Sequence, residues 1–141
     1  MQKNAILVIA LALLCLAVHS TETSFPKALR NCTAFTDSGT VSSSGMNIKS
    51  TKHIIGWQGD KCVYKENVSF SGIDSEIVCR FTKPQLDELA SVLEAYELMQ
   101  KYADEKPDFS DLDEVQKNPA VRAWQKYLAN ESICKVSAEQ N

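Results

Sequence analysis

The sequence predicts a small α+β domain in which an antiparallel β-meander of three or four strands, over residues 32–81, carries two C-terminal helices on one face. Apolar and polar residues alternate in the runs before residue 81, and the spacing of apolar residues becomes helical after Thr82. An apolar sheet face and two apolar helix stripes are buried most simply as two packed layers. Four cysteines downstream of an export leader predict that disulfides stabilise this domain.

Residues 1–20 have the pattern of a cleaved secretory signal peptide. Lys3 gives a positively charged start, Ala5–Val18 is an unbroken apolar run, and Ser20 supplies the small residue at its exit. The run is shorter than the about 20 residues that a membrane-spanning helix needs. We therefore expect a secreted or periplasmic protein without a membrane span, whose mature chain starts near Thr21.

The composition bounds the number of domains and the partners. The chain has 141 residues with 15 basic and 18 acidic side chains, which gives a net charge of −3. It contains no dense basic block, and this disfavours binding to nucleic acid or to anionic membranes. We expect one domain over 32–134, preceded by an N-terminal arm at 21–31 that forms one helical turn and followed by a flexible tail at 135–141.

A β-hairpin is the clearest local signal. Two β-prone runs, Met46–Trp57 and Lys61–Phe70, flank Gly59-Asp60, which fits a two-residue type II′ turn. This register places Cys62 opposite Trp57 and Glu66 opposite His53. The apolar face would consist of Trp57, Ile55, Cys62, Tyr64, Val68 and Phe70. The polar face would consist of Lys61, Val63, Lys65, Asn67, Lys52 and Ile54.

The cysteines that remain after leader removal predict two disulfides: Cys32, Cys62, Cys79 and Cys134. No C-x2-C pair suggests a metal or redox site. Three pairings are open, and we favour Cys32–Cys134 with Cys62–Cys79, because Cys32–Cys134 closes the longest loop. A tight turn into a third strand at Glu76–Phe81 would separate Cys62 from Cys79 by about 13 Å, so this pairing requires a bulge or a longer loop.

The helices are predicted from their caps. Thr82-Lys83-Pro84-Gln85 is a capping box that starts a helix reaching about Ala103. A short helical turn follows between Asp111 and Lys117. Asn118-Pro119 then starts a last helix that reaches about Leu128.

The hairpin tip is a candidate binding site. Trp57, Gln58 and Gly59 would present an aromatic anchor to a protein partner, although covering the core or a disulfide is the commoner role for such a tryptophan. The sequons begin at Asn31, Asn67 and Asn130. They would carry glycans in a eukaryotic secretory pathway and would have no meaning in a bacterial envelope protein.

Catalytic and metal sites are not predicted. His53 opposite Glu66 has the form of a general-base pair, but a structural cross-strand pair is commoner. The acidic stretch 105–114 lacks the glycine and the ligand spacing of a calcium loop. No nucleotide, phosphate-loop or hydrolase motif is present, and we expect no cofactor.

These observations favour a non-enzymatic exported module that binds a protein through the hairpin tip, a sheet edge or a helix face. A secreted inhibitor or host-directed effector, in which the hairpin plugs a cleft, is the alternative. A small hydrolase that uses His53 is a distant third.

Overall fold

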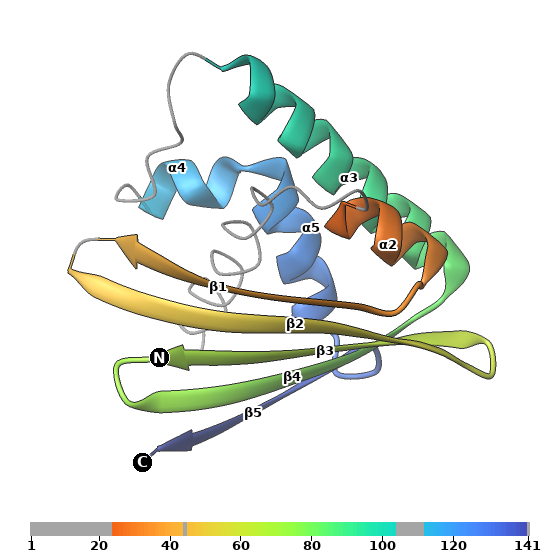
Figure 1. The fold of residues 1–141 in the computed structure, drawn as a ribbon, viewed down its shortest axis with the longest axis horizontal. Coiled ribbons are helices and arrows are strands. Elements are labelled where there is room, and N and C mark those ends of the chain that lie inside the picture. Colours follow the sequence, from red (N-terminus) through yellow and green to blue (C-terminus); the bar gives the residue numbers. More distant parts are fainter. Residues whose placement is uncertain (1–23, 44, 104–111, 141) are drawn as a thin grey trace.

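The computed structural model describes residues 24–43, 45–103 and 112–140. A five-stranded antiparallel sheet has the strand order β1-β2-β3-β4-β5. The helices α2 to α5 all lie on one face of this sheet, so the domain has two layers (Figure 1). The strands are β1 (Phe35–Ser43), β2 (Met46–Gln58), β3 (Lys61–Phe70), β4 (Ile73–Phe81) and β5 (Cys134–Gln140). The helices are α2 (Phe25–Asn31), α3 (Lys83–Tyr102), α4 (Leu112–Lys117) and α5 (Pro119–Leu128).

The α+β class and the helices on one sheet face are confirmed. Thr82 and Gln85 form the predicted capping box at the start of α3, and the Asn118 side chain caps α5. Helix α3 ends one residue before Ala103. In the N-terminal arm, helix α2 starts after the Ser24 cap, and its Leu29 is completely buried.

Helix α2 is attached to α3 through charged side chains. Arg30 donates to both carboxylate oxygens of Glu94, at 3.4 and 2.7 Å, and Lys83 Nζ donates to the Arg30 carbonyl at 3.2 Å. The hydrogen bond to Glu94 is the main cause of a raised Arg30 pKa. These groups are partly solvated, so they orient α2 more than they stabilise it.

Two tight turns shape the central strands. Gly59 has φ 64° and Asp60 a negative φ, which agrees with the predicted type II′ turn between β2 and β3. Ser71 and Gly72 both have positive φ, at 47° and 76°, as a type I′ turn requires. Both turn types match the twist of paired strands, so β2, β3 and β4 form a compact meander.

The predicted β2–β3 register is correct only near the turn. Trp57 pairs with Cys62 as expected, but a β-bulge between Ile54 and Gly56 shifts all earlier pairs by one residue. Glu66 therefore lies opposite Lys52 rather than His53. The extra residue also exchanges the faces of β2, so the predicted faces are wrong for the residues before Gly56. Ile54 and Lys52 are buried, whereas Ile55 is exposed.

The flexible tail predicted at 135–141 is wrong for residues 135–140. These residues belong to β5, which pairs along β4 from Ile73–Gln140 to Cys79–Cys134. Val136 and Ala138 point to the helix side, while Lys135, Ser137 and Glu139 alternate with them. This short alternation adds a fifth strand to the three or four that were expected.

The core lies between the sheet and α2, α3 and α5. Trp124 on α5 is completely buried, and its ring centroid lies 5.5 Å from Tyr64 and 6.2 Å from Phe81. Tyr64 also contacts Phe25 of α2, with 6.0 Å between centroids. One aromatic cluster thus joins α2, the central strands and α5. None of the described helices is long and apolar enough to cross a membrane.

Candidate functional site

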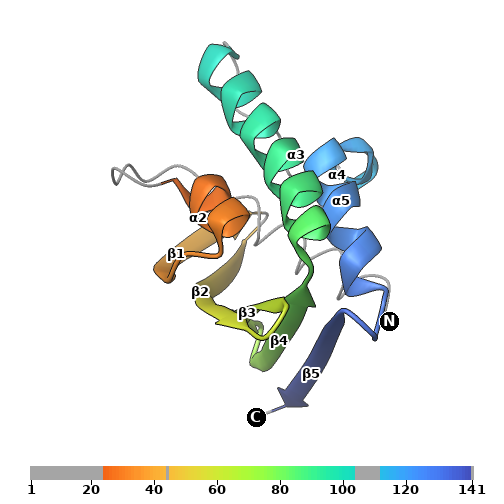
Figure 2. The same ribbon diagram turned by 90° about the vertical axis from the view of Figure 1, so that its right-hand side faces the viewer.

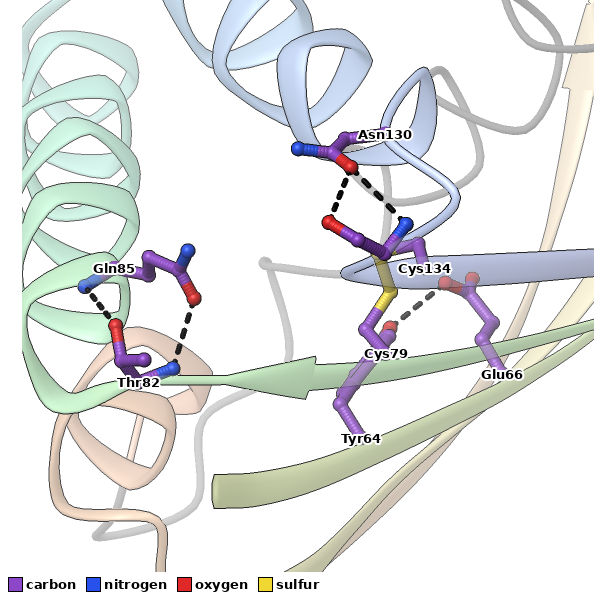
Figure 3. Close-up of a disulfide and its surroundings, with 8 residues drawn as sticks. Tyr64, Glu66, Cys79, Thr82, Gln85, Asn130 and Cys134 are labelled. Atoms are coloured by element: carbon purple, nitrogen blue, oxygen red, sulfur yellow. Dashed lines mark hydrogen bonds between the residues drawn. A yellow bond between two sulfur atoms is a disulfide. The ribbon is translucent and has the colours of Figure 1, made fainter. Parts of the chain in front are cut away.

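Two disulfides are present, and the favoured pairing is wrong. Cys32 is bonded to Cys62, and Cys79 is bonded to Cys134. Strand β5 places Cys134 directly opposite Cys79, with 4.1 Å between their Cα atoms (Figure 3). The end of α2 brings Cys32 over Cys62, with a Cα separation of 5.9 Å. The position of β5 decides the pairing, and a Cys134 expected at the end of the domain, just before a flexible tail, gave no such constraint.

The hairpin tip carries two exposed apolar side chains. Ile55 is 50% exposed and Trp57 is 44% exposed. Trp57 lies opposite Cys62 and therefore shares the face on which the Cys32–Cys62 disulfide lies. The tip extends past the ends of β1 and α2 (Figure 1). Trp57 is therefore accessible beside the disulfide and is not buried beneath the core.

The tip is held from both faces of the sheet. On the helix side, Cys62 is covalently attached to the end of α2. On the other side, Arg80 Nη1 of β4 donates to Gln58 Oε1 at 3.2 Å. Gly59 closes the turn with its positive φ. Trp57, Gln58 and Gly59 are thus brought together on a braced projection, and sequence reasoning missed the contribution of Ile55.

The predicted pairing of His53 with Glu66 is wrong. The bulge places His53 opposite Lys65, and its Nδ1 lies 3.3 Å from Thr36 Oγ1 on the face away from the helices. Glu66 points to the helix side and is completely buried. These two side chains lie on opposite faces of the sheet, so they cannot act as an acid–base pair.

Glu66 and Lys52, which lies opposite it, form the centre of a buried polar cluster. Lys52 and Glu66 both have 0% exposed side chains, in neighbouring strands. Tyr64 donates from its hydroxyl to Glu66 Oε2 at 2.7 Å (Figure 3), and Ser50 donates a short hydrogen bond to Glu66 Oε1. The Lys52 ammonium lies 4.5 Å from the centre of the Phe25 ring. We call these five residues the inner polar cluster.

Burial and charge oppose one another in this cluster. Desolvation raises the pKa of Glu66, while the charge of Lys52 and the two hydroxyl donors counteract part of that shift. Desolvation also raises the pKa of Tyr64 well above its usual value, with a further contribution from Glu66. Glu97 on α3 has a raised pKa as well, mainly through burial, and Lys52 lowers it. Lys52 therefore acts electrostatically on carboxyl groups from both layers.

The inner polar cluster is suited to a structural role. Its charged groups are enclosed between the sheet and the helices, where a substrate cannot reach Glu66.

The bulge that buries Lys52 opposite Glu66 has one signal in the sequence. A glycine inside a strand is a known sign of a bulge, and Gly56 is the residue that could have revealed it.

The sequon asparagines Asn31, Asn67 and Asn130 are all exposed. Asn67 lies on β3, on the sheet face without helices. Asn130 Oδ1 accepts from the backbone amide and the hydroxyl of Ser132, at 3.0 and 2.6 Å. Glycan attachment stays a prediction at each position.

Within the described ranges, no group of three or more His, Cys, Asp or Glu side chains is arranged to hold a metal ion. The acidic stretch falls largely on 104–111, outside the described residues. Comparison with protein-family models, with curated proteins and with solved structures finds no match.

Proposed function

We propose that this chain is an exported, non-enzymatic protein that binds a protein partner through the tip of the β2–β3 hairpin. The observation that carries the proposal is the pair of exposed side chains, Ile55 and Trp57, on a projecting turn braced by the Cys32–Cys62 disulfide. Tryptophan is enriched among the residues that dominate binding energy at protein interfaces. Disulfides and the apolar leader are compatible with an extracellular or periplasmic location.

Bracing supports a binding role because an ordered loop loses less conformational entropy on association. Each flexible side chain that is immobilised at an interface costs about 0.5–1.5 kcal/mol. The disulfide below Trp57 and the Arg80–Gln58 hydrogen bond already restrict the backbone around the tip. A preformed tip can therefore use more of its apolar contact area for affinity.

A secreted inhibitor or effector is the second candidate function. The narrow projection formed by two strands and a two-residue turn has a shape that suits insertion into a cleft. An inhibitor would lower the activity of its target, whereas a protein that only binds a partner would not have this effect. The hydrolase alternative is not supported by an acid–base pair of His53 and Glu66, because Glu66 lies opposite Lys52 and His53 lies opposite Lys65.

Photo-crosslinking tests the proposal. A photo-crosslinking amino acid at position 60, which is exposed in the turn, should capture the partner when the chain is expressed with its leader and illuminated. The same amino acid at position 49, exposed in the middle of β2, is the matched control and should give no such adduct. Mass spectrometry of the adduct identifies the partner.

Trp57 supplies the specificity control. Trp57→Ala should reduce the yield of the position-60 adduct at least tenfold, since loss of a central aromatic anchor costs about 2 kcal/mol or more. Far-UV circular dichroism should remain that of the unchanged protein, because Trp57 lies outside the core. An adduct that forms equally well from both positions, or that survives Trp57→Ala, would refute binding through the tip. Inhibition of a captured enzyme by the unchanged chain, and not by Trp57→Ala, would favour the inhibitor.

A further inference from the structure

We propose that β5 pairs antiparallel with β5 of a second copy of this chain, about a two-fold axis through Ser137. Strand β5 is an edge of the sheet and pairs with β4 on one side only. Figure 2 shows no other helix or strand of the described residues along its other side. An open edge strand is a template for another strand, and its side-chain pattern decides which partner fits. The hairpin tip is a separate surface, so this inference does not depend on the proposed function.

The backbone of β5 presents hydrogen-bonding groups at alternate residues. The Arg80 amide of β4 donates to the Ile133 carbonyl at 2.9 Å, so the odd-numbered residues direct their backbone groups toward β4. The close approach of Cys79 and Cys134, with 4.1 Å between Cα atoms, agrees with this phase. The N–H and C=O groups of Val136 and Ala138 therefore point to the open edge.

The charges on β5 select one register. Pairing about Ser137 aligns Val136 with Ala138 of the second copy and, by symmetry, Ala138 with Val136 of the second copy. Each of these two pairs can form two backbone hydrogen bonds. The same register aligns Lys135 with Glu139 of the second copy, twice. Registers centred on Val136 or Ala138 keep the backbone phase but lose both ion pairs.

Two features of the isolated chain fit this partner. Glu139 lies opposite Asp74 of β4, and like charges in directly opposed positions are destabilising. Lys135 of a second copy would lie next to these two carboxylates. Val136 is 42% exposed although it faces the helix side, and Ala138 of the second copy would cover part of it.

The other edge strand lacks this complementarity. Symmetric pairing of β1 about Gly39 would align Asp37 with Val41 and would form no ion pair. Lys135 and Glu139, in contrast, have no ion pair in the described part of the chain. Because two seven-residue strands bury less surface than a standard interface, we expect a weak dimer that depends on concentration.

Sedimentation velocity of the purified full chain with both disulfides formed tests the charge pairing. The unchanged chain should dimerise as its concentration rises to about 1 mM. Lys135→Glu alone and Glu139→Lys alone should each weaken dimerisation at least about tenfold, because two attractive pairs become repulsive. An equimolar mixture of these two variants should form heterodimers. The Lys135→Glu chain has an acidic residue at both positions and the Glu139→Lys chain has a basic residue at both, so both cross-strand pairs are again attractive. Lys49→Glu, an equal charge change on an exposed β2 position, is the control and should dimerise normally.

Disulfide trapping tests the register independently. Ser137→Cys in a Cys15→Ser background should give a covalent dimer under mild oxidation, because residues 137 of the two copies would lie opposite one another with Cα atoms about 4.5 Å apart. Thr40→Cys on the β1 edge, in the same background, should remain monomeric. A monomeric unchanged chain at about 1 mM, or dimerisation that ignores the charge changes, would overturn the proposal. Species larger than a dimer would also overturn it, because head-to-tail β1–β5 pairing gives rings or open filaments, whereas symmetric β5–β5 pairing stops at two copies.

Discussion

At the scale of single residues, the main departure from expectation is the burial of Lys52 and Glu66. The alternating pattern of β2 places Lys52 on the solvated face, yet its side chain is completely buried and lies over Phe25. A buried pair of charges contributes little net stability, but removal of one partner is costly. The inner polar cluster should therefore affect both the pH dependence of stability and the response to substitution.

Glu66→Gln should remove a contribution to stability that decreases as the pH rises. Burial raises the pKa of Glu66 in the folded protein, so between the unfolded and folded pKa values the native state binds more protons than the unfolded state. The free energy of unfolding therefore falls as the pH rises through this window, starting near the unfolded value of about 4.3. Urea unfolding from pH 4 to 8 measures the effect. The difference in stability between the unchanged protein and Glu66→Gln should decrease with pH.

Glu76→Gln is the control for that experiment, since Glu76 forms an exposed ion pair with Lys65 at 3.1 Å. It should leave the slope of stability against pH close to that of the unchanged protein. Parallel curves for Glu66→Gln and the unchanged protein would contradict the role assigned to the Glu66 carboxyl.

Lys52→Met should destabilise the protein by about 3 kcal/mol near pH 7, because it leaves Glu66 buried without its nearest cation. Methionine keeps the aliphatic contact with Phe25, so the loss reports mainly the charge. In Lys52→Met with Glu66→Gln, the cost should be at least about 1 kcal/mol below the sum of the single changes. Urea unfolding of the four proteins gives this coupling energy, and strictly additive costs would show that the two groups act separately.

At the scale of the elements, one extra residue determines which side chains of β2 face the core. The bulge between Ile54 and Gly56 lies beyond the end of β1, so the pairing of β1 with β2 is regular throughout. Lys49, Thr51, His53 and Ile55 consequently share the face opposite to the buried residues of β2. Bulges often reorient side chains next to functional sites, and this one immediately precedes Trp57.

Deletion of Ile55 should therefore be tolerated. Without this residue, Gly56 still pairs with Val63 and Ile54 still pairs with Tyr64, so every buried residue of β2 keeps its place. We expect a change of less than about 1 kcal/mol in the free energy of unfolding, together with loss of the partner adduct at position 60, because the tip changes its direction.

Deletion of Thr51 is the matched control for the Ile55 deletion. It moves Lys49 into the buried place of Ser50 and turns Ile48 outward, which should cost several kcal/mol. Urea unfolding compares the two deletions, and equal losses would contradict the assigned bulge.

At the scale of the whole molecule, local signals were sufficient for the fold class and insufficient for the long-range connections. Thr82, Asn118 and Gly59 predict helix starts and a turn from neighbours within four residues, and all three are confirmed. The disulfide pairing depends on where the chain returns after α5. Residues 135–139 alternate with the correct period, but the pattern is too short to be separated from a flexible end without β4 beside it.

The candidate site was predicted only in part, because some of its features depend on local signals and others on the pairing between strands. Trp57 and Gly59 follow from the turn, whereas the role of Ile55 and the isolation of His53 from Glu66 follow from the bulge. Gly56 was the single residue that signalled the bulge. A glycine in a strand fits other roles as well, so the sequence alone did not fix the phase of β2.

The two disulfides should protect different regions of the molecule although their entropic contributions are similar. They join residues separated by 30 and 55 positions, and the chain-entropy model gives each about 4 kcal/mol, with a difference of only about 0.5 kcal/mol. Removing one disulfide or the other should therefore cost a similar free energy of unfolding but should loosen a different part of the fold. Among the described strands, β5 pairs only with β4, whereas α2 contacts α3 and the aromatic cluster.

Replacing Cys79 and Cys134 together by alanine should lower the free energy of unfolding by about 4 kcal/mol and should release β5 selectively. The amides of Ser137 and Glu139 face β4, and their hydrogen exchange should accelerate most, while the β2–β3 amides remain the slowest to exchange. Replacing Cys32 and Cys62 is the matched comparison and should accelerate exchange in α2 instead. Hydrogen exchange measured by NMR distinguishes the two patterns. Uniform acceleration in both variants would mean that the disulfides stabilise one indivisible unit, and β5 would then not be an independently held edge.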